Sequence, residues 1–417
     1  MRFAVRAFAA GLVLLLGCSD QQSTQPTAPR SFGGPTTYVT CPNIDQARAL
    51  VKALYPAGAA QNTAVNQVVQ LYKFAAANKV GDARAVMFNL LQTLLQNYFA
   101  GTLTGGQTTP TQTNVLSLVN GLYCVVGLPQ PNLPLGVLGP DGAAAIVLPG
   151  TTTTLVRTAT QFAAVNVPAA SLPTPALVTI TRLPDEPGPL LTPLDQYPAF
   201  YEFTASPAVT FNADVLVGVC QVASFTPPDY SRLKVGHNVG PTVELLPRTA
   251  VPFIDCTNLT GGLGFGFNRG WRELASTLFL PQAAEAATVA TCCLGGTTKK
   301  FSPFGAVDTL AIIDPASRTI EGPANTPVTA SQLPRVVIVT PTGRPVPGVT
   351  VTFAIPAGSQ GSITGAVQIT DATGAATLGG WTLGDGSVPN DVTATATPLV
   401  PGSGFANNPA QFHAFTQ

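Results

Sequence analysis

Hydrophobic positions change their spacing along the chain. Between residues 43 and 126 apolar side chains recur every three or four positions, in four runs separated by short turns. This spacing predicts four amphipathic helices that form a small antiparallel bundle over 41–130. Asn62 and Asp82 precede two of the runs and are the expected N-caps. The helices should bury their aromatic side chains as core residues rather than display them to a ligand: Tyr72, Phe74, Phe88, Tyr98 and Phe99.

From about residue 135 the spacing changes to alternation, which is typical of strands. VLVGVC at 215–220 and the runs SRLKVGHNV and PTVELLPRTAVPFIDC indicate a β-sandwich over 135–260. GRPVPGVTVTFAI at 343–355 alternates strictly, and the runs after it predict a second sandwich over 307–417. Between the two, 261–306 is Gly-rich and fits neither spacing, so we expect a loose connection with one short helix. The predicted fold class is multidomain and mainly β, with an N-terminal helical bundle followed by two β-sandwiches.

Three segments resemble known modules. The helical segment is similar in pattern and length to the FIMAH-like module of bacterial secreted proteins. AAVNVPAASLPTPALVTITRLPD with YPAFYEFTASPAVTFNADVLVGVC resembles the β-sandwich module shared by ankyrins, netrin receptors and tight-junction scaffolds, where it is a mechanical or protein-contact unit. The C-terminal segment, with GRPVPGVTVTFAI and TDATGAATLGGWTLG, resembles the bacterial Ig-like domain of the invasin and intimin type. This last resemblance implies that Trp381 is a core anchor between two sheets.

The first residues have the features of an export signal. An apolar run at 8–16 follows two arginines and is shorter than the about 20 residues that cross a bilayer, so 1–17 is predicted to be a signal peptide. The run closes on LLGC, which resembles the bacterial lipobox and implies that Cys18 is lipidated. Ser19, and not Asp, follows the cysteine, and this pattern resembles that of proteobacterial lipoproteins sorted to the outer membrane. The rest of 18–40 is rich in Ser, Thr, Gln, Pro and Gly and is predicted to be a flexible tether. The alternative is a plain secretory signal in which Cys18 has no role.

The remaining cysteines predict disulfides. An even number in an exported chain is typical of a disulfide framework. Cys41 and Cys124 bracket the helices, and a bridge between them would contribute about 4 kcal/mol in the chain-entropy model. Neighbouring cysteines rarely bond to each other, so Cys292 and Cys293 should each bond to Cys220 or Cys256, in an order that stays open. The alternative, a metal site, would have no C-x-x-C motif and only two histidines.

Charge and chemistry narrow the function. Charged residues are 10% of the chain, the 20 basic and 20 acidic residues cancel, and no basic stripe is present, so no nucleic-acid partner is expected. His237, near Asp229 and Asp255, is the only base that we would test as the centre of a hydrolase, and no G-x-S-x-G turn accompanies it. The other residues considered for a catalytic or metal-binding role are expected at solvated or half-exposed positions, and we assign none of them to a site. They are His413, Asp185, Glu186 and Asp371.

The sequence therefore favours a non-enzymatic envelope protein, without cofactor or metal, that has a structural or adhesive contact role. It is expected to be exported and anchored by lipid to the outer membrane, on the cell surface or the periplasmic face, and to contact a protein or a glycan. One alternative is a module that binds glycans or another envelope polymer, which would place Trp271, Tyr201 and Tyr230 on one open face. The other is the hydrolase, which would bring His237 and two carboxylates together in a cleft.

Overall fold

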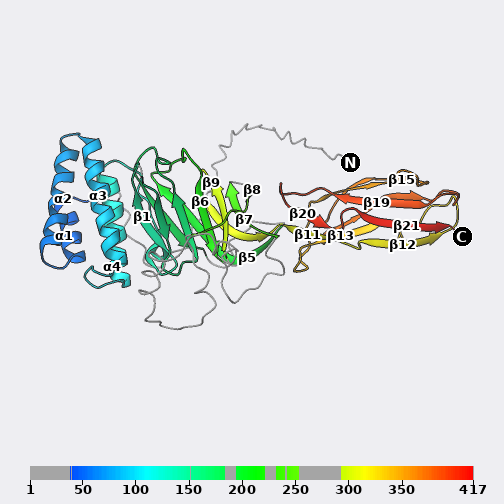
Figure 1. Ribbon diagram of the computed structural model, residues 1–417, viewed down its shortest axis with the longest axis horizontal. Coiled ribbons are helices and arrows are strands. Elements are labelled where there is room, and N and C mark those ends of the chain that lie inside the picture. The colour runs from blue at the N-terminus through cyan, green and yellow to red at the C-terminus, as the bar shows by residue number, and fades with distance from the viewer. Residues whose placement is uncertain are drawn as a thin grey trace, which may run out of the picture. The chain divides into compact units, whose positions relative to one another are not determined.

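The computed structural model describes residues 38, 40–150, 152–183, 194–220, 232–239, 242–252 and 293–416 (Figure 1). Within these residues the chain is mainly β, with four α-helices and several sheets. The mainly β prediction and the four predicted helices are confirmed. Cys18, the proposed lipid site, lies outside the described residues.

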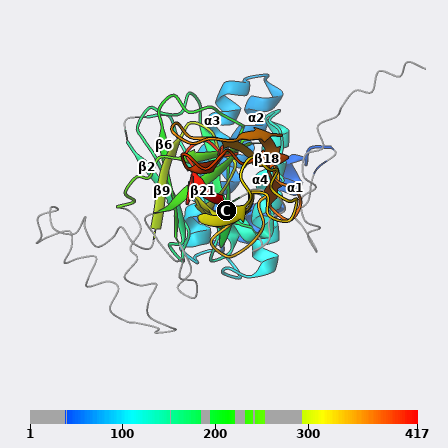
Figure 2. The ribbon, with the colours of Figure 1, turned by 90° about the vertical axis from the view of Figure 1, so that its right-hand side faces the viewer.

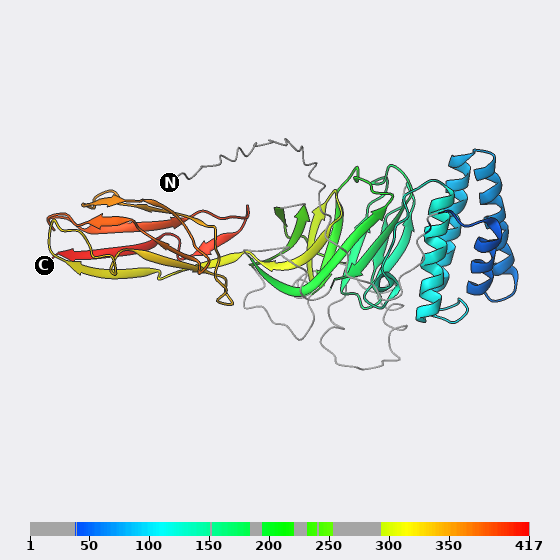
Figure 3. The ribbon, with the colours of Figure 1, turned by 180° about the vertical axis from the view of Figure 1, so that it is seen from behind.

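The four helices come first in the described chain and pack side by side (Figures 1 and 3). The side chain of Asn43 caps the first helix and forms a capping box with Gln46. The predicted N-caps at Asn62 and Asp82 are wrong, because these two helices begin earlier, after Gly58 and Lys79. Asp82 lies in the first turn instead, where a carboxylate is favoured by the helix dipole. The helices are α1 (Ile44–Leu54), α2 (Ala59–Ala76), α3 (Val80–Phe99) and α4 (Thr109–Val125).

A disulfide closes the helical segment. Cys41 and Cys124 are bonded with a Cα–Cα distance of 5.3 Å, which confirms the predicted pair. Tyr98 and Phe88 are buried in the core of the helices and Tyr72, Phe74 and Phe99 pack against it, as predicted. This core continues past the last helix into a short 3-10 helix, η1 (Leu135–Leu138). It also includes Ala144, Ile146 and Leu177, which lie on the outer face of the larger sheet described next. The helices therefore pack on the outer face of the sheet, through a hydrophobic cluster separate from the one that lies between the two sheets.

Two sheets enclose the central core. The larger sheet has the order β1-β4-β5-β10-β7-β8 and the smaller one the order β2-β3-β6-β9, of which β2, β6 and β9 are labelled in Figure 2. Their inward-facing side chains form one buried cluster that includes Val215, Val217 and Val219, which the alternation placed on a common face. The strands are β1 (Ala143–Val147), β2 (Thr154–Arg157), β3 (Ala163–Val167), β4 (Ala176–Arg182), β5 (Asp195–Ser206), β6 (Val215–Cys220), β7 (Leu233–Val239), β8 (Thr242–Leu246), β9 (Cys293–Thr298) and β10 (Pro303–Asp308).

The expected loose connection over 261–306 is wrong for its last part, because residues from Cys293 onward form two strands, β9 and β10. β9 pairs with β6 in the smaller sheet, and β10 lies between β5 and β7 in the larger one. The glycines that suggested a loop are required by close packing. A Cβ atom on Gly296 would lie 2.5 Å from the Cβ of Leu246, and one on Gly295 would lie 2.4 Å from the carbonyl oxygen of Thr249. Residues 261–292, including the expected short helix near Trp271, lie outside the described part.

The second disulfide joins neighbouring strands of the smaller sheet. Cys220 of β6 lies opposite Cys293 of β9 and is bonded to it, with a Cα–Cα distance of 4.0 Å. This is one of the two pairings that the sequence left open for Cys293. Cys256 and Cys292 lie outside the described residues, so the expected bond between these two stays a prediction.

The C-terminal strands form a second β core. One sheet has the order β17-β13-β11-β20, another the order β12-β21-β19-β14-β16, and β15 pairs with β18. Trp381 is 2% exposed and lies in this core, and Val349, Val351 and Phe353 are buried, as their alternation predicts. The strands are β11 (Leu310–Asp314), β12 (Ser317–Gly322), β13 (Arg335–Val339), β14 (Thr350–Ala354), β15 (Ser362–Thr364), β16 (Val367–Ile369), β17 (Ala375–Thr377), β18 (Gly380–Thr382), β19 (Asn390–Ala396), β20 (Gly404–Ala406) and β21 (Ala410–Thr416).

Candidate functional site

His237, the candidate base, lies on β7 and is 1% exposed. Its ring stacks on the ring of Phe304 with centroids 4.4 Å apart, and its Nδ1 lies 3.4 Å from a carboxylate oxygen of Glu244 on β8. Burial lowers the pKa of His237 more than the Glu244 carboxylate raises it, and the Lys300 charge lowers it further. The imidazole is therefore held neutral inside the sandwich.

The surroundings of His237 do not assemble a hydrolase site in the described part of the chain. There, Nε2 of His237 has no hydrogen-bond partner, and no Ser, Thr or Cys side chain bonds to the ring. A triad needs a nucleophile on one ring nitrogen and a carboxylate on the other. Asp229 and Asp255, the acidic residues near it in sequence, lie outside the described residues. The contacts that are seen are those of a core histidine stacked on an aromatic ring.

Replacing His237 by Gln should flatten the pH dependence of stability. Because the folded chain holds the pKa of His237 below the ordinary value of 6.5, the unfolded chain takes up a proton first as the pH falls. Wild-type stability should therefore decrease as the pH falls below 6.5, and this component should be absent in His237→Gln. Urea unfolding at a series of pH values from 7.5 down to 5 measures the slope.

The matched control for this experiment is His413→Gln, which removes the other histidine and leaves His237 in place. An equal slope in wild-type protein and in His237→Gln would contradict the assignment of a neutral buried imidazole.

His413 lies at a half-exposed position on β21, as predicted. Its Nδ1 is 2.9 Å from a carboxylate oxygen of Asp391 on β19, and the hydroxyl of Ser359 donates to the other oxygen of the same carboxylate, at 3.2 Å. The carboxylate thus lies between the serine and the histidine. Because the imidazole does not contact the hydroxyl, this group lacks the arrangement that activates a serine nucleophile.

Asp371 occupies a tight turn between β16 and β17. Its carboxylate accepts hydrogen bonds from the backbone N–H and the hydroxyl of Thr373, at 2.8 and 2.6 Å, and from the N–H of Ala375, at 3.1 Å. These donors lower the pKa of Asp371, the Thr373 hydroxyl most of all. The carboxylate serves the turn itself. Asp185 and Glu186 lie outside the described residues.

The alternative of a glycan groove loses one of its aromatic residues. Tyr201 is 1% exposed and belongs to the core of the central sandwich, so its ring is not on an open face. Trp271 and Tyr230 lie outside the described residues. No described cluster of three or more His, Cys, Asp or Glu side chains has the spacing of a metal site.

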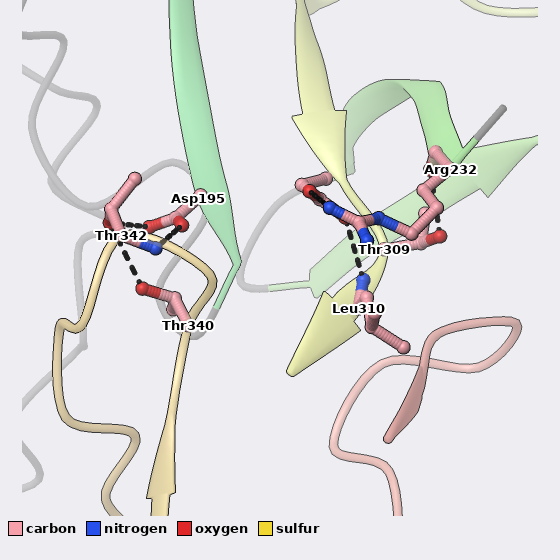
Figure 4. A network of polar contacts seen from close by, with 7 residues as sticks. Asp195, Arg232, Thr309, Leu310, Thr340 and Thr342 are labelled. Carbon is pink, nitrogen blue, oxygen red and sulfur yellow. Dashed lines mark hydrogen bonds and ion pairs between the residues drawn. The ribbon is translucent and has the colours of Figure 1, made fainter. Parts of the chain in front are cut away.

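Two buried aspartates mark a site that the sequence analysis missed, where β10 of the central sandwich continues into β11 with only Thr309 between them (Figure 4). Asp308 is completely buried at the end of β10. It accepts a hydrogen bond from Arg232 at 3.1 Å and one from the N–H of Leu310 at 3.0 Å. The hydroxyl of Thr309 donates to the carbonyl of Arg232 at 2.8 Å. These hydrogen bonds fix the chain where it passes from β10 to β11, on both sides of Thr309.

Asp195, at the start of β5, lies opposite Asp308 in the sheet and bonds to the C-terminal part. Its carboxylate accepts the backbone N–H of Thr342 at 3.0 Å and the Thr342 hydroxyl at 2.8 Å, from the loop that follows β13 (Figure 4). Arg344 of the same loop lies 3.7 Å from this carboxylate and donates to the carbonyl of Leu194. Asp195 therefore ties a central strand to the C-terminal β core through two hydrogen bonds and one ion pair.

Apolar packing reinforces these polar contacts. Val400, from the loop before β20, belongs to one buried cluster with Leu194, Phe200 and Val307 of the central sandwich. The ammonium of Lys234 donates to the carbonyl of Gly402 at 3.1 Å in the same loop. We call this set of contacts the junction: Asp195, Arg232, Lys234, Asp308, Thr309, Thr342, Arg344 and Val400, with their partners. Charged residues are rare in this chain, so those that stand beside apolar runs, as in PFGAVD and SRLKV, are the sequence feature that could have indicated the junction.

Comparison with models of known protein families and with curated proteins gives no match for this sequence. In the part of the chain that the structure describes, none of the helices combines the length and the hydropathy needed to cross a bilayer. The two disulfides indicate an oxidising, exported environment.

Proposed function

We propose that this chain is a non-enzymatic, lipid-anchored protein of the bacterial cell envelope that holds its C-terminal β domain at a fixed position for structural or adhesive contact. The observation that carries the proposal is the junction. A single residue separates β10 from β11, the buried carboxylate of Asp195 bonds to Thr342 across it, and the buried carboxylate of Asp308 accepts the N–H of Leu310 at the start of β11. Domains that move freely are joined by longer, exposed linkers with few contacts.

The export features support the location. The LLGC sequence at Cys18 supplies a lipidation site of the lipobox type, and the polar segment after it supplies a tether. Two disulfides fit the oxidising compartment beyond the inner membrane. The C-terminal β core, with Trp381 buried in it, fits an Ig-like domain of the invasin and intimin type, a fold that serves both structural and adhesive proteins.

A cell-fractionation experiment tests the anchor. The full wild-type chain should be found with the outer membrane, and Cys18→Ala should be released into the soluble fraction because the thiol that carries the lipid is absent. The matched control is Ser19→Ala, which changes the neighbouring residue and leaves the thiol. Membrane association of Cys18→Ala equal to that of the wild type would refute lipid anchoring at this residue.

Protease treatment of intact cells separates the two forms of the role. An antibody against residues 307–417 should detect loss of the C-terminal part in intact cells if the role is adhesive. Protection until the outer membrane is opened would indicate a structural role inside the envelope. A periplasmic protein that stays intact in the same sample is the control for membrane integrity.

A further inference from the structure

The C-terminal β core has one sheet edge that is not protected. β16 is the last strand in the order β12-β21-β19-β14-β16. Its side chains Val367 and Ile369 are 61% and 66% exposed, which places them among the most exposed large apolar residues described. Free edges of this kind are usually blocked by charged residues or proline, because they can pair with another strand.

The opposite edge of the same sheet shows such protection. β12 carries Arg318 and Glu321 on its exposed positions, and Pro315 and Pro323 flank it. The segment 362–370 around β16, SITGAVQIT, contains no charged residue and no proline. One sheet thus has a protected edge and an unprotected edge.

The backbone of β16 is oriented for pairing. The carbonyl of Ala366 accepts from Phe353, and the N–H of Thr370 donates to Val349. Since hydrogen-bonded positions alternate along an antiparallel strand, the N–H and C=O groups of Val367 and Ile369 point away from β14. The two residues with exposed side chains are therefore also those whose backbone groups face the open edge.

We propose that a second copy of this chain pairs with β16, antiparallel, about a two-fold axis at Gln368. In this register Val367 of one copy lies opposite Ile369 of the other, so two β-branched pairs form on one face, which is a favourable cross-strand combination. Gln368 lies opposite Gln368 of the second copy. Because the segment is uncharged, the two-fold axis places no like charges opposite each other, and the edge is complementary to itself.

Cysteine cross-linking in the full chain tests the register. Residues at a non-hydrogen-bonded antiparallel position have Cα atoms about 4.5 Å apart, within the range of a disulfide. Gln368→Cys should therefore form a covalent dimer on mild oxidation, visible on a non-reducing gel. Gln411→Cys, which places a thiol at an exposed position on β21, is the matched control and should remain monomeric.

A charge substitution tests the edge independently. Adding Ile369→Lys to Gln368→Cys should reduce the cross-linked dimer about tenfold, because the charged side chain would replace the apolar contact between Ile369 and Val367 of the second copy. Adding Phe415→Lys instead, at a position of similar exposure on β21, should leave the yield unchanged. Cross-linking of Gln368→Cys no greater than that of Gln411→Cys, or unchanged by Ile369→Lys, would overturn the proposal.

Discussion

Replacing both Cys41 and Cys124 by Ala should lower the free energy of unfolding by about 4 kcal/mol. The bridge spans a sequence separation of 83 residues, so its loss frees a long loop in the unfolded chain. It also holds the start of the helical segment against the end of α4. Chemical denaturation followed by the helical circular-dichroism signal measures the change in midpoint.

Reduction provides the control for this variant. A reducing agent should move the wild-type midpoint at least as far as the double substitution does, and should move the variant less because only the other disulfides remain in it. If the double variant unfolded at the wild-type midpoint, the bridge would have no part in stability.

Replacing Asp308 by Ala should cost about 3 kcal/mol, since it removes a buried carboxylate together with its charge-assisted hydrogen bond from the partly exposed Arg232. Asp308 is completely buried, and its loss would also leave the N–H of Leu310 without its acceptor. Beyond the loss of stability, we expect the C-terminal β core to uncouple from the central sandwich. Calorimetry should then resolve an additional transition, and limited proteolysis should cut near Thr309.

Asp214→Ala is the matched control for Asp308→Ala, because it makes the same chemical change at an exposed position of the central sandwich. Such a surface substitution should change stability by about 0.5 kcal/mol or less. Equal effects of the two substitutions, or unchanged proteolysis of Asp308→Ala, would show that the junction does not couple the two β cores.

Local patterns were sufficient to predict the helices and the alternating strands. The apolar spacing over 43–126 identifies all four helices because each buries one face, and the alternation at 349–353 identifies β14 for the same reason. The Cys41–Cys124 pair was predictable because Cys41 precedes the first helix and Cys124 lies in the last turn of the fourth. The bond between Cys220 and Cys293 was only one of two options, since choosing it requires the register of β6 against β9.

Features that depend on distant partners were not predictable. β9 was missed because Gly295 and Gly296 resemble loop residues in sequence, although their small size is what allows Leu246 and Thr249 to approach. The junction was missed because Asp195 and Thr342 are far apart in the chain, and no spacing rule relates them. His237 was selected from the sequence as the base to test, and its burial was not predictable because it depends on the pairing of β7 with β10 and β8.

The parallel pairing of β12 with β21 has a mechanical consequence. β12 follows β11 after two residues, so a force that enters through β10 and passes along β11 pulls on β12 at its Ser317 end. A force on the C-terminus pulls on β21 at its Thr416 end, and the register from Ser317–Gln411 to Gly322–Thr416 places the two loads in opposite directions along neighbouring strands. The hydrogen bonds between these strands are then loaded in shear and must break together, which resists extension far better than unzipping them singly.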